Sequence, residues 1–239
     1  MPSLDSVLSL LSTGALELKG QFTWGSNYTF LVEVTQGEQT CGAVYKPERG
    51  ERPLWDFPEG TLARREVAAY AVSRALGWDL VPATVLRADG PAGPGSLQLY
   101  VDADPQRHYF VFSESERQRL RPVALFDLLI NNADRKGGHV LLGDSDHLWL
   151  IDHGVCFHAD DKLRTVIWDF VGEPIPRELL AVLRRARPSL DDGGSLHTEL
   201  RGLLAAEEIH ALRARADRLL RSKRFPPPGV GRPYPWPLV

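Results

Sequence analysis

DLLINNADRKGGHVLLGDSDHLWLIDHG, residues 127–154, contains two carboxylates that apolar segments carry to neighbouring turns. An apolar run leads into a polar turn that contains Asp134, and two short β-like runs then lead to Asp152. Carboxylates are costly to bury unpaired, so two of them beside apolar runs need a cation, a hydrogen-bond donor or water. The stretch therefore indicates a site that handles Mg²⁺ and phosphate, where one acid orients a hydroxyl group and the other holds the metal.

In this stretch, the pattern D-R-x-x-x-H followed by I-D-x-G resembles the catalytic and metal-binding loops of the phosphatidylinositol 3-/4-kinase-like superfamily. The chain is similar to a set of small actinobacterial proteins that carry ADRKGGHVLL and IDHG in this form. The resemblance implies a two-lobed, protein-kinase-like α+β fold, with Asp134 as catalytic aspartate and Asp152 as metal-binding aspartate. His139 stands where these kinases usually have a metal-binding asparagine. Because imidazole suits softer divalent ions than Mg²⁺, Mn²⁺ is an alternative metal.

The composition is that of an ordinary globular protein. Hydrophobic residues make up 43% and charged residues 25% of the 239 positions, which suits one large domain or two lobes around one cleft. The net charge of −3 gives no indication of nucleic-acid binding. Two cysteines are too few for a disulfide framework, no apolar run approaches the ~20 residues that span a bilayer, and the first residues lack the basic segment of a signal peptide. We therefore expect a cytoplasmic protein without a transmembrane segment.

The element pattern predicts two lobes and a tail. Residues 1–101 are expected to form a β-rich N-lobe whose main helix, at 61–76, is capped by Thr61 and ended by Gly77. The expected β-runs lie at 15–19, 28–34, 40–46, 80–86 and 96–101, after a short helix at 3–12 and with a turn at 89–95. A mainly helical C-lobe is expected over 102–225, with helices at 114–132 (restarting at Pro122), 176–187 and 196–222, before a proline-rich tail at 226–239.

Lys46 ends the third β-run, and strand alternation places it on the same face as Val44, which points inward if the strand is half buried. An inward lysine needs an anionic partner. The resemblance implies that Lys46 is the ATP-phosphate lysine and that Glu66 on the main helix is its acid. The alternatives are a strand-end lysine that points into water and an ordinary surface glutamate.

Two further segments are candidates for nucleotide contacts. The turn containing Gly25 and Ser26 can donate backbone N–H groups to phosphates, although most such turns only connect hairpin strands. The resemblance places adenine against the segment joining the lobes, near Gln98, Tyr100 and Val101, where backbone groups would bind it. An ordinary core strand explains the apolar side chains of that segment equally well.

Several C-lobe features have two interpretations. Asp127 is either a hydrogen-bond partner of the following turn or an exposed acid. Trp168 and Phe170 either line an acceptor pocket or, more often for such aromatics, belong to the core. The basic face of the last helix is either solvated or a binding surface for anionic lipid or polyphosphate.

The chemistry implied by the resemblance is phosphoryl transfer from ATP, with Mg²⁺ or Mn²⁺, to an unidentified small molecule, lipid headgroup or protein. Asp134 would accept a hydrogen bond from the acceptor hydroxyl, and Lys136 would reach the γ-phosphate. Asp152 and His139 would hold the metal. One alternative is a nucleotide-binding pseudokinase with a regulatory role. Another is a metal-dependent hydrolase built from Asp152, His153, His158 and neighbouring acids.

Overall fold

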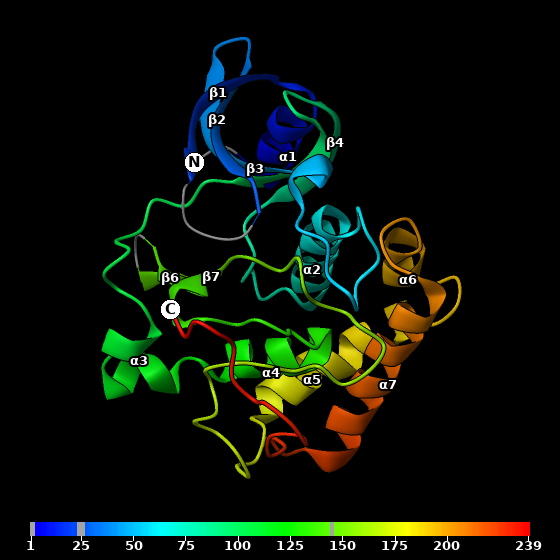
Figure 1. Cartoon of the computed structure of the whole chain (residues 1–239). Coiled ribbons are helices and arrows are strands. Elements are labelled where there is room, and N and C mark those ends of the chain that lie inside the picture. The colour runs from blue at the N-terminus through cyan, green and yellow to red at the C-terminus, as the bar shows by residue number, and fades with distance from the viewer. Residues whose placement is uncertain (1–2, 23–26, 144–145) are drawn as a thin grey trace.

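The computed structural model describes residues 3–22, 27–143 and 146–239 and has the predicted two-lobed α+β fold. In Figure 1 a curved sheet forms one lobe, and most of the helices gather in the other. The helices are α1 (Leu4–Thr13), α2 (Leu62–Leu76), α3 (Glu114–Gln118), α4 (Arg121–Ile130), α5 (Arg177–Ala186), α6 (Ser195–Leu200) and α7 (Ala206–Ser222). The strands are β1 (Ala15–Phe22), β2 (Thr29–Gln36), β3 (Gln39–Pro47), β4 (Thr84–Gly90), β5 (Gly93–Leu99), β6 (Val140–Leu142) and β7 (Leu148–Leu150). The lobe boundaries expected at 101/102 and 225/226 stay predictions.

The five-stranded sheet has the order β1-β2-β3-β5-β4, with every neighbouring pair antiparallel. Alternation along the central strand β3 is as predicted: Ala43 and Tyr45 are fully buried, while Val44 and Lys46 line a cavity on the other face. The turn expected over 89–95 is shorter than predicted and occupies residues 91–92, because β4 runs to Gly90 and pairs there with Gly93. Gly93 has a φ of 100°, which a glycine adopts without a steric penalty and which closes the hairpin tightly.

Helix α2 begins without the predicted side-chain cap. Thr61 already has near-helical angles (φ −112°, ψ −8°), and its hydroxyl donates to the carbonyl oxygen of Pro58 instead. Glu51 caps the start of α2 instead, since its Oε1 accepts the backbone N–H of Ala63 at 2.9 Å. Gly77 ends the helix in a left-handed conformation (φ 63°), as predicted. A residue outside the helix therefore ties the preceding loop to the first turn of α2.

The C-lobe helices differ from the predictions in one place. A break after α3 and a restart with Pro122 in the first turn of α4 are as predicted. The single helix expected over 196–222 is wrong, because residues 201–205 separate α6 from α7. The backbone of Ala205 is extended, and its N–H donates to the side chain of Glu208 at 3.0 Å, which starts a new helix. None of the described helices is long and apolar enough to cross a membrane.

The basic face predicted on the last helix includes one residue that is not at the surface. Arg215 is only 3% exposed, and its Nε donates to the carbonyl oxygen of Leu129 on α4 at 2.9 Å. Phe170 is likewise a core residue, at 2% exposure, which decides the choice between core and acceptor pocket for that side chain. Arg215 thus joins α7 to the centre of the C-lobe, and Phe170 joins the 164–170 segment to it.

The proline-rich tail lies along the C-lobe and ends next to β6 in Figure 1. The carbonyl oxygen of Pro233 accepts the backbone N–H of Thr165 at 3.1 Å, and that of Leu238 accepts the N–H of Gly137 at 2.7 Å. A Cβ at Gly137 would lie 2.9 Å from the Phe110 ring, so the close approach of this ring depends on glycine. The tail is therefore an ordered strap, defined here as residues 233–239, that contacts the turn after Asp134.

Candidate active site

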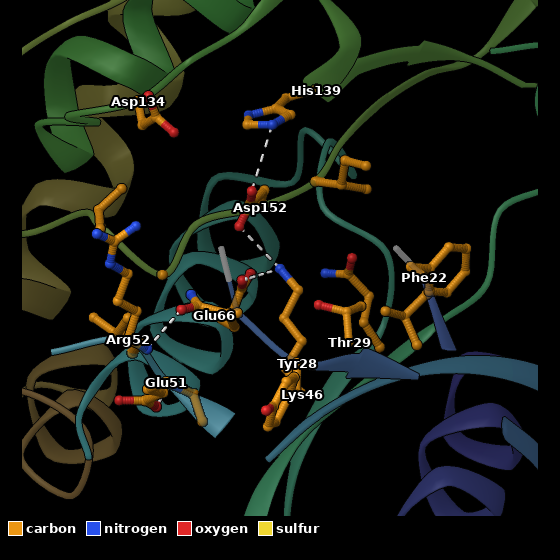
Figure 2. A pocket seen from close by; sticks show the side chains of 18 of the residues that line it. Phe22, Tyr28, Thr29, Lys46, Glu51, Arg52, Glu66, Asp134, His139 and Asp152 are labelled. Atoms are coloured by element: carbon orange, nitrogen blue, oxygen red, sulfur yellow. Dashed lines mark hydrogen bonds and ion pairs between the residues drawn. The ribbon is translucent and has the colours of Figure 1, made fainter. Parts of the chain in front are cut away.

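A cavity of about 630 Å³ lies where the sheet, α2 and the turns after α4 and β7 meet. Figure 2 shows side chains from both lobes along its wall. Every predicted site residue that the structure describes lines it, namely Lys46, Glu66, Gln98, Tyr100, Val101, Asp134, Lys136, His139 and Asp152. Gly25 and Ser26 lie outside the described residues. Positions up to 106 residues apart in the sequence thus meet in one cavity.

Lys46 is the centre of an ion-pair cluster. Its Nζ lies 2.5 Å from Oε1 of Glu66 and 3.0 Å from Oδ1 of Asp152 (Figure 2). Burial opposes the charged ammonium, but the two carboxylates outweigh it and raise the pKa of Lys46 above its ordinary value. The water-facing alternative for Lys46 and the surface alternative for Glu66, which is 3% exposed, are both wrong. The cluster joins β3, α2 and the turn after β7.

The turn after β7, residues 152–154 (the Asp152 turn), has an unusual backbone. Asp152 has a φ of 61°, in the left-handed region that few residues other than glycine adopt, and such strain is often found at functional sites. The Lys46 ammonium holds the pKa of this carboxyl well below its usual range. His139 Nε2 lies 3.4 Å from Oδ2 of Asp152, and burial lowers the pKa of His139 to about 4. A charged carboxylate and a neutral imidazole therefore lie side by side, and both can act as metal ligands.

Asp134 begins a second turn, residues 134–139 (the Asp134 turn). Its backbone N–H donates to the Asn132 side chain at 2.9 Å, and its Oδ2 lies 3.1 Å from Nζ of Lys136. Burial raises the pKa of Asp134 to about 6, against the opposing effect of Lys136 and of Arg164. A carboxylate with a pKa near neutrality can accept and release a proton readily.

A fully buried network connects the two turns beneath the cavity. Arg135 Nε lies 3.1 Å from Oδ1 of Asp127, and its NH1 and NH2 groups reach the carbonyl oxygen of Ile151 (2.9 Å) and Nε2 of His153 (2.8 Å). The His153 backbone N–H donates to Glu66 at 2.9 Å. Asp127 is thus a partner of the turn and not an exposed acid, and Arg135 is structural. This arginine fixes the Asp134 turn relative to the Asp152 turn.

The hydrolase alternative requires several metal ligands together, and the geometry does not provide them. In the part of the chain that the structure describes, no group of three or more His, Cys, Asp or Glu side chains is placed to hold a metal ion. His153, one of the proposed ligands, is fully buried and its Nε2 contacts Arg135. Asp152 and His139 form a two-residue set, which suits an ion that takes its other ligands from phosphate and water.

The segment predicted to bind adenine lies at the edge of the cavity but offers few main-chain groups. Gln98 lies in β5 between Val44 and Thr84, and its side-chain amide donates to the Thr84 hydroxyl at 2.9 Å. The Tyr100 N–H donates to the carbonyl oxygen of Gly42 at 3.0 Å. A base would therefore have to use other groups of the segment, such as the main chain of Val101.

Sequence reasoning missed one wall of the cavity. Arg52, Trp55 and Arg164 line it, from the loop between β3 and α2 and from the segment after the Asp152 turn. The proline-bearing loop has no motif that indicates a function, and Arg164 has no sequence neighbour that points to Asp134. No signal in the sequence alone could have placed either arginine there.

No family model matches this chain, but comparison with known proteins finds a relative that covers nearly all of it. It is 44% identical to protein Rv2133c of Mycobacterium tuberculosis over 268 aligned positions, which cover 98% of this chain and 95% of that protein. This chain belongs to the Rv2133c family. A more distant relative is phosphatidylinositol 4-kinase gamma 4 of Oryza sativa, 27% identical over 77% of this chain and 39% of that much longer protein.

Solved structures show which known fold this chain shares. The Helicobacter pylori proinflammatory kinase CtkA superposes with a TM-score of 0.55 at 12% identity, covering 90% of this chain and 94% of that one. Hydra Fam20, solved with sugar, gives a TM-score of 0.53 at 15% identity over 92% of this chain and 88% of that one. At these identities the likeness is one of fold, and the fold is kinase-like.

Proposed function

We propose that this protein is an ATP-dependent phosphotransferase with an acceptor still to be identified. The observation that carries the proposal is the contact of Lys46 with both Glu66 and Asp152 in the cavity that also contains Asp134. A lysine fixed by a helix glutamate, next to one acid for a metal and across from another for a hydroxyl, is the set of groups that phosphoryl transfer needs. The kinase-like fold and the relative named as a phosphatidylinositol 4-kinase support it.

Lys46 and Glu66 act on the nucleotide in this proposal. Glu66 is held by the N–H of His153, so it fixes the ammonium of Lys46 in the cavity. Lys46 binds the α- and β-phosphates, and the backbone near Val101 holds the base. Asp152 and His139 would hold Mg²⁺ or Mn²⁺, which neutralises phosphate charge when it is bound. Because Lys46 contacts Asp152 at 3.0 Å, this ion pair has to loosen when metal and phosphates enter.

Asp134 and Lys136 act on the transferred group. Asp134 accepts a hydrogen bond from the acceptor hydroxyl and orients its oxygen toward the γ-phosphorus. The acceptor oxygen bonds to phosphorus as the bond from phosphorus to the β–γ bridging oxygen breaks, ADP leaves, and the hydroxyl proton passes to Asp134. Lys136, 3.1 Å from Asp134, is close enough to contact the γ-phosphate oxygens.

Turnover of radiolabelled ATP tests the proposal. Purified protein is incubated with Mg²⁺ or Mn²⁺ and a metabolite extract, and phosphorylated products are read by mass spectrometry. We expect product formation that Asp134→Asn reduces by about 10²- to 10⁴-fold while nucleotide binding is retained. Asp160→Asn, a change in an exposed acid outside the cavity, serves as the control.

Two outcomes would contradict this assignment. Nucleotide-dependent thermal stabilisation without turnover in either metal would make the protein a nucleotide-binding pseudokinase, in which His139 in place of an oxygen ligand has removed efficient metal use. If ATP does not stabilise the protein at all, the protein does not bind this nucleotide and the proposal is wrong.

A further inference from the structure

The wall of the cavity beyond Asp134 carries charge that the proposed nucleotide contacts do not use. Arg52 and Arg164 are exposed side chains on this wall, and Trp55 at its rim is 92% exposed. The described residues that are assigned to the nucleotide lie on β3 and α2, and in or directly after β5. The cavity therefore has room and polar groups for a second ligand.

Arg164 is fixed beside Asp134 by its backbone. Its N–H donates to the carbonyl oxygen of Asn132 at 2.9 Å, and its own carbonyl accepts the N–H of Arg135 at 2.9 Å. These two partners flank Asp134 in the sequence. The positive charge of Arg164 opposes the increase in the pKa of Asp134, as expected for a guanidinium close to that carboxyl. A group bound to Arg164 would thus lie next to the proposed acceptor hydroxyl.

Arg52 is fixed from the opposite side. Its backbone N–H donates to the Asn27 side chain at 2.7 Å, and its neighbour Glu51 caps α2. Farther along the same loop, Asp56 and Lys162 form an ion pair at 2.9 Å that ties the loop to the segment containing Arg164. Figure 2 shows the Arg52 side chain extending away from its loop along the cavity wall, on the side where Asp134 lies in that view.

Neither guanidinium has an acid partner among the side chains that the structure describes. The other two basic groups with full charge in the cavity are paired, Lys46 with two carboxylates and Lys136 with Asp134. Two guanidinium groups without a counter-ion on one wall of a concave site are suited to bind phosphate or carboxylate.

We propose that Arg52 and Arg164 form an anion subsite for the acceptor, which is then a small acidic molecule with a phosphate or carboxylate group near its reactive hydroxyl. This inference rests on the proposed function. The Trp55 ring, with Lys162 Nζ 4.8 Å from its centroid, supplies a flat face at the rim for the rest of the acceptor. Because Arg164 lies beside Asp134 and not beside Lys46, the anion belongs to the acceptor and not to the nucleotide.

Inorganic phosphate is the probe, and thermal stabilisation of the full chain is the readout. With the site saturated by a non-hydrolysable ATP analogue and Mg²⁺, we expect phosphate to stabilise the wild type further and saturably. Arg52→Gln and Arg164→Gln should each weaken phosphate binding by at least about tenfold, because each removes a charged hydrogen-bond donor, while analogue binding is unchanged. Arg49→Gln is the matched control, since Arg49 is an exposed arginine of the same segment outside the cavity.

Three results would overturn the subsite. The first is no phosphate effect when the analogue is bound. The second is an effect that persists in both arginine variants, which would make the anion adventitious. The third is a loss of analogue binding in Arg52→Gln or Arg164→Gln, which would assign the arginines to the nucleotide.

Different experimental results would reject the anion subsite and the proposed function. If the ATP analogue does not stabilise the protein, the proposed function fails, and phosphate is then titrated alone. A phosphate effect that Arg164→Gln removes and Lys46→Met retains would keep the anion subsite. The reverse pattern would place the anion at Lys46 and overturn the subsite as well.

Discussion

The two sides of the cavity differ in how their charges are balanced. On the β3 side, Lys46 has two carboxylate partners within 3.0 Å, and one of them is held by the backbone of a third residue. On the loop side, Arg52 and Arg164 are held through their backbones, and their guanidinium groups meet no acid among the described residues. A ligand entering the first side must replace existing ion pairs, whereas one entering the second adds missing partners. The second side is therefore where ligand charge should decide selectivity.

The largest loss of activity is expected for Lys46→Met, which removes the cation of the β3 side. The change leaves Glu66 and Asp152 without their shared cation and removes the proposed contact to the phosphates. We expect phosphoryl transfer to fall by about 10²- to 10³-fold, as when a preorganised electrostatic group is lost. Initial rates of labelled-phosphate transfer measure it. Lys19→Met is the control, because Lys19 also contacts two glutamates but on an exposed strand face of the same lobe. An equal loss of transfer rate in both variants would contradict the special role of Lys46.

The pH dependence of kcat/KM, which reports groups of the unliganded protein, tests the role of Asp134 at the boundary between the two sides. Asp134 must be ionised to take up the proton of the acceptor hydroxyl, and burial raises its pKa to about 6. Above this pH the carboxylate form dominates, so activity should be level there and fall by about tenfold per pH unit well below it. The residual rate of Asp134→Asn should lack this acid limb. If the rate instead falls around the ordinary aspartate pKa, burial does not raise the pKa of Asp134.

A second variant tests the same pH profile through a smaller expected change, a shift in the pKa of Asp134. Lys136 lowers the pKa of Asp134 through an ion pair at 3.1 Å, which partly opposes the effect of burial. Lys136→Met should therefore raise the pKa and move the acid limb to higher pH. Arg49→Gln, which removes a positive charge outside the cavity, should leave the limb where it is. A limb that moves to lower pH in Lys136→Met would contradict the assignment of the limb to Asp134.

The smallest effect concerns the connection between the sides. Glu51 caps the helix that carries Glu66 and precedes Arg52, so it couples the loop to α2. Glu51→Ala should destabilise the protein by about 1 kcal/mol, or about 2–4 °C in Tm for a chain of this size. Differential scanning calorimetry measures this, with Glu59→Ala, an exposed acid of the same loop, as the control. A Tm change in Glu59→Ala as large as that in Glu51→Ala would remove the capping argument.

The sequence predicts the β3 side well because Lys46 and Glu66 lie in regular elements, and Asp134 and Asp152 lie in turns with a recognisable motif. Strand alternation puts Lys46 on the same face as Val44, while the resemblance to the kinase-like loops singles out Glu66, Asp134 and Asp152. The roles of these residues remain proposals, while their meeting in one cavity is a structural result.

The loop side could not be predicted in this way. The position of Arg164 depends on backbone hydrogen bonds to residues about 30 positions earlier, and Arg52 depends on a contact with Asn27. Capping by Glu51 and the break between α6 and α7 were missed for a related reason. In each case one or two hydrogen bonds decide the local structure, and the periodic hydrophobic pattern does not specify them.

The strap at residues 233–239 has a practical consequence for anyone producing this protein. Leu238 contacts the backbone of Gly137, so an affinity tag or fluorescent protein joined after Val239 would start beside the Asp134 turn. Such a fusion could pull on that turn and lower activity without touching any reacting group. Fusions placed before α1, which packs on the face of the sheet opposite Lys46, are the safer choice for assays.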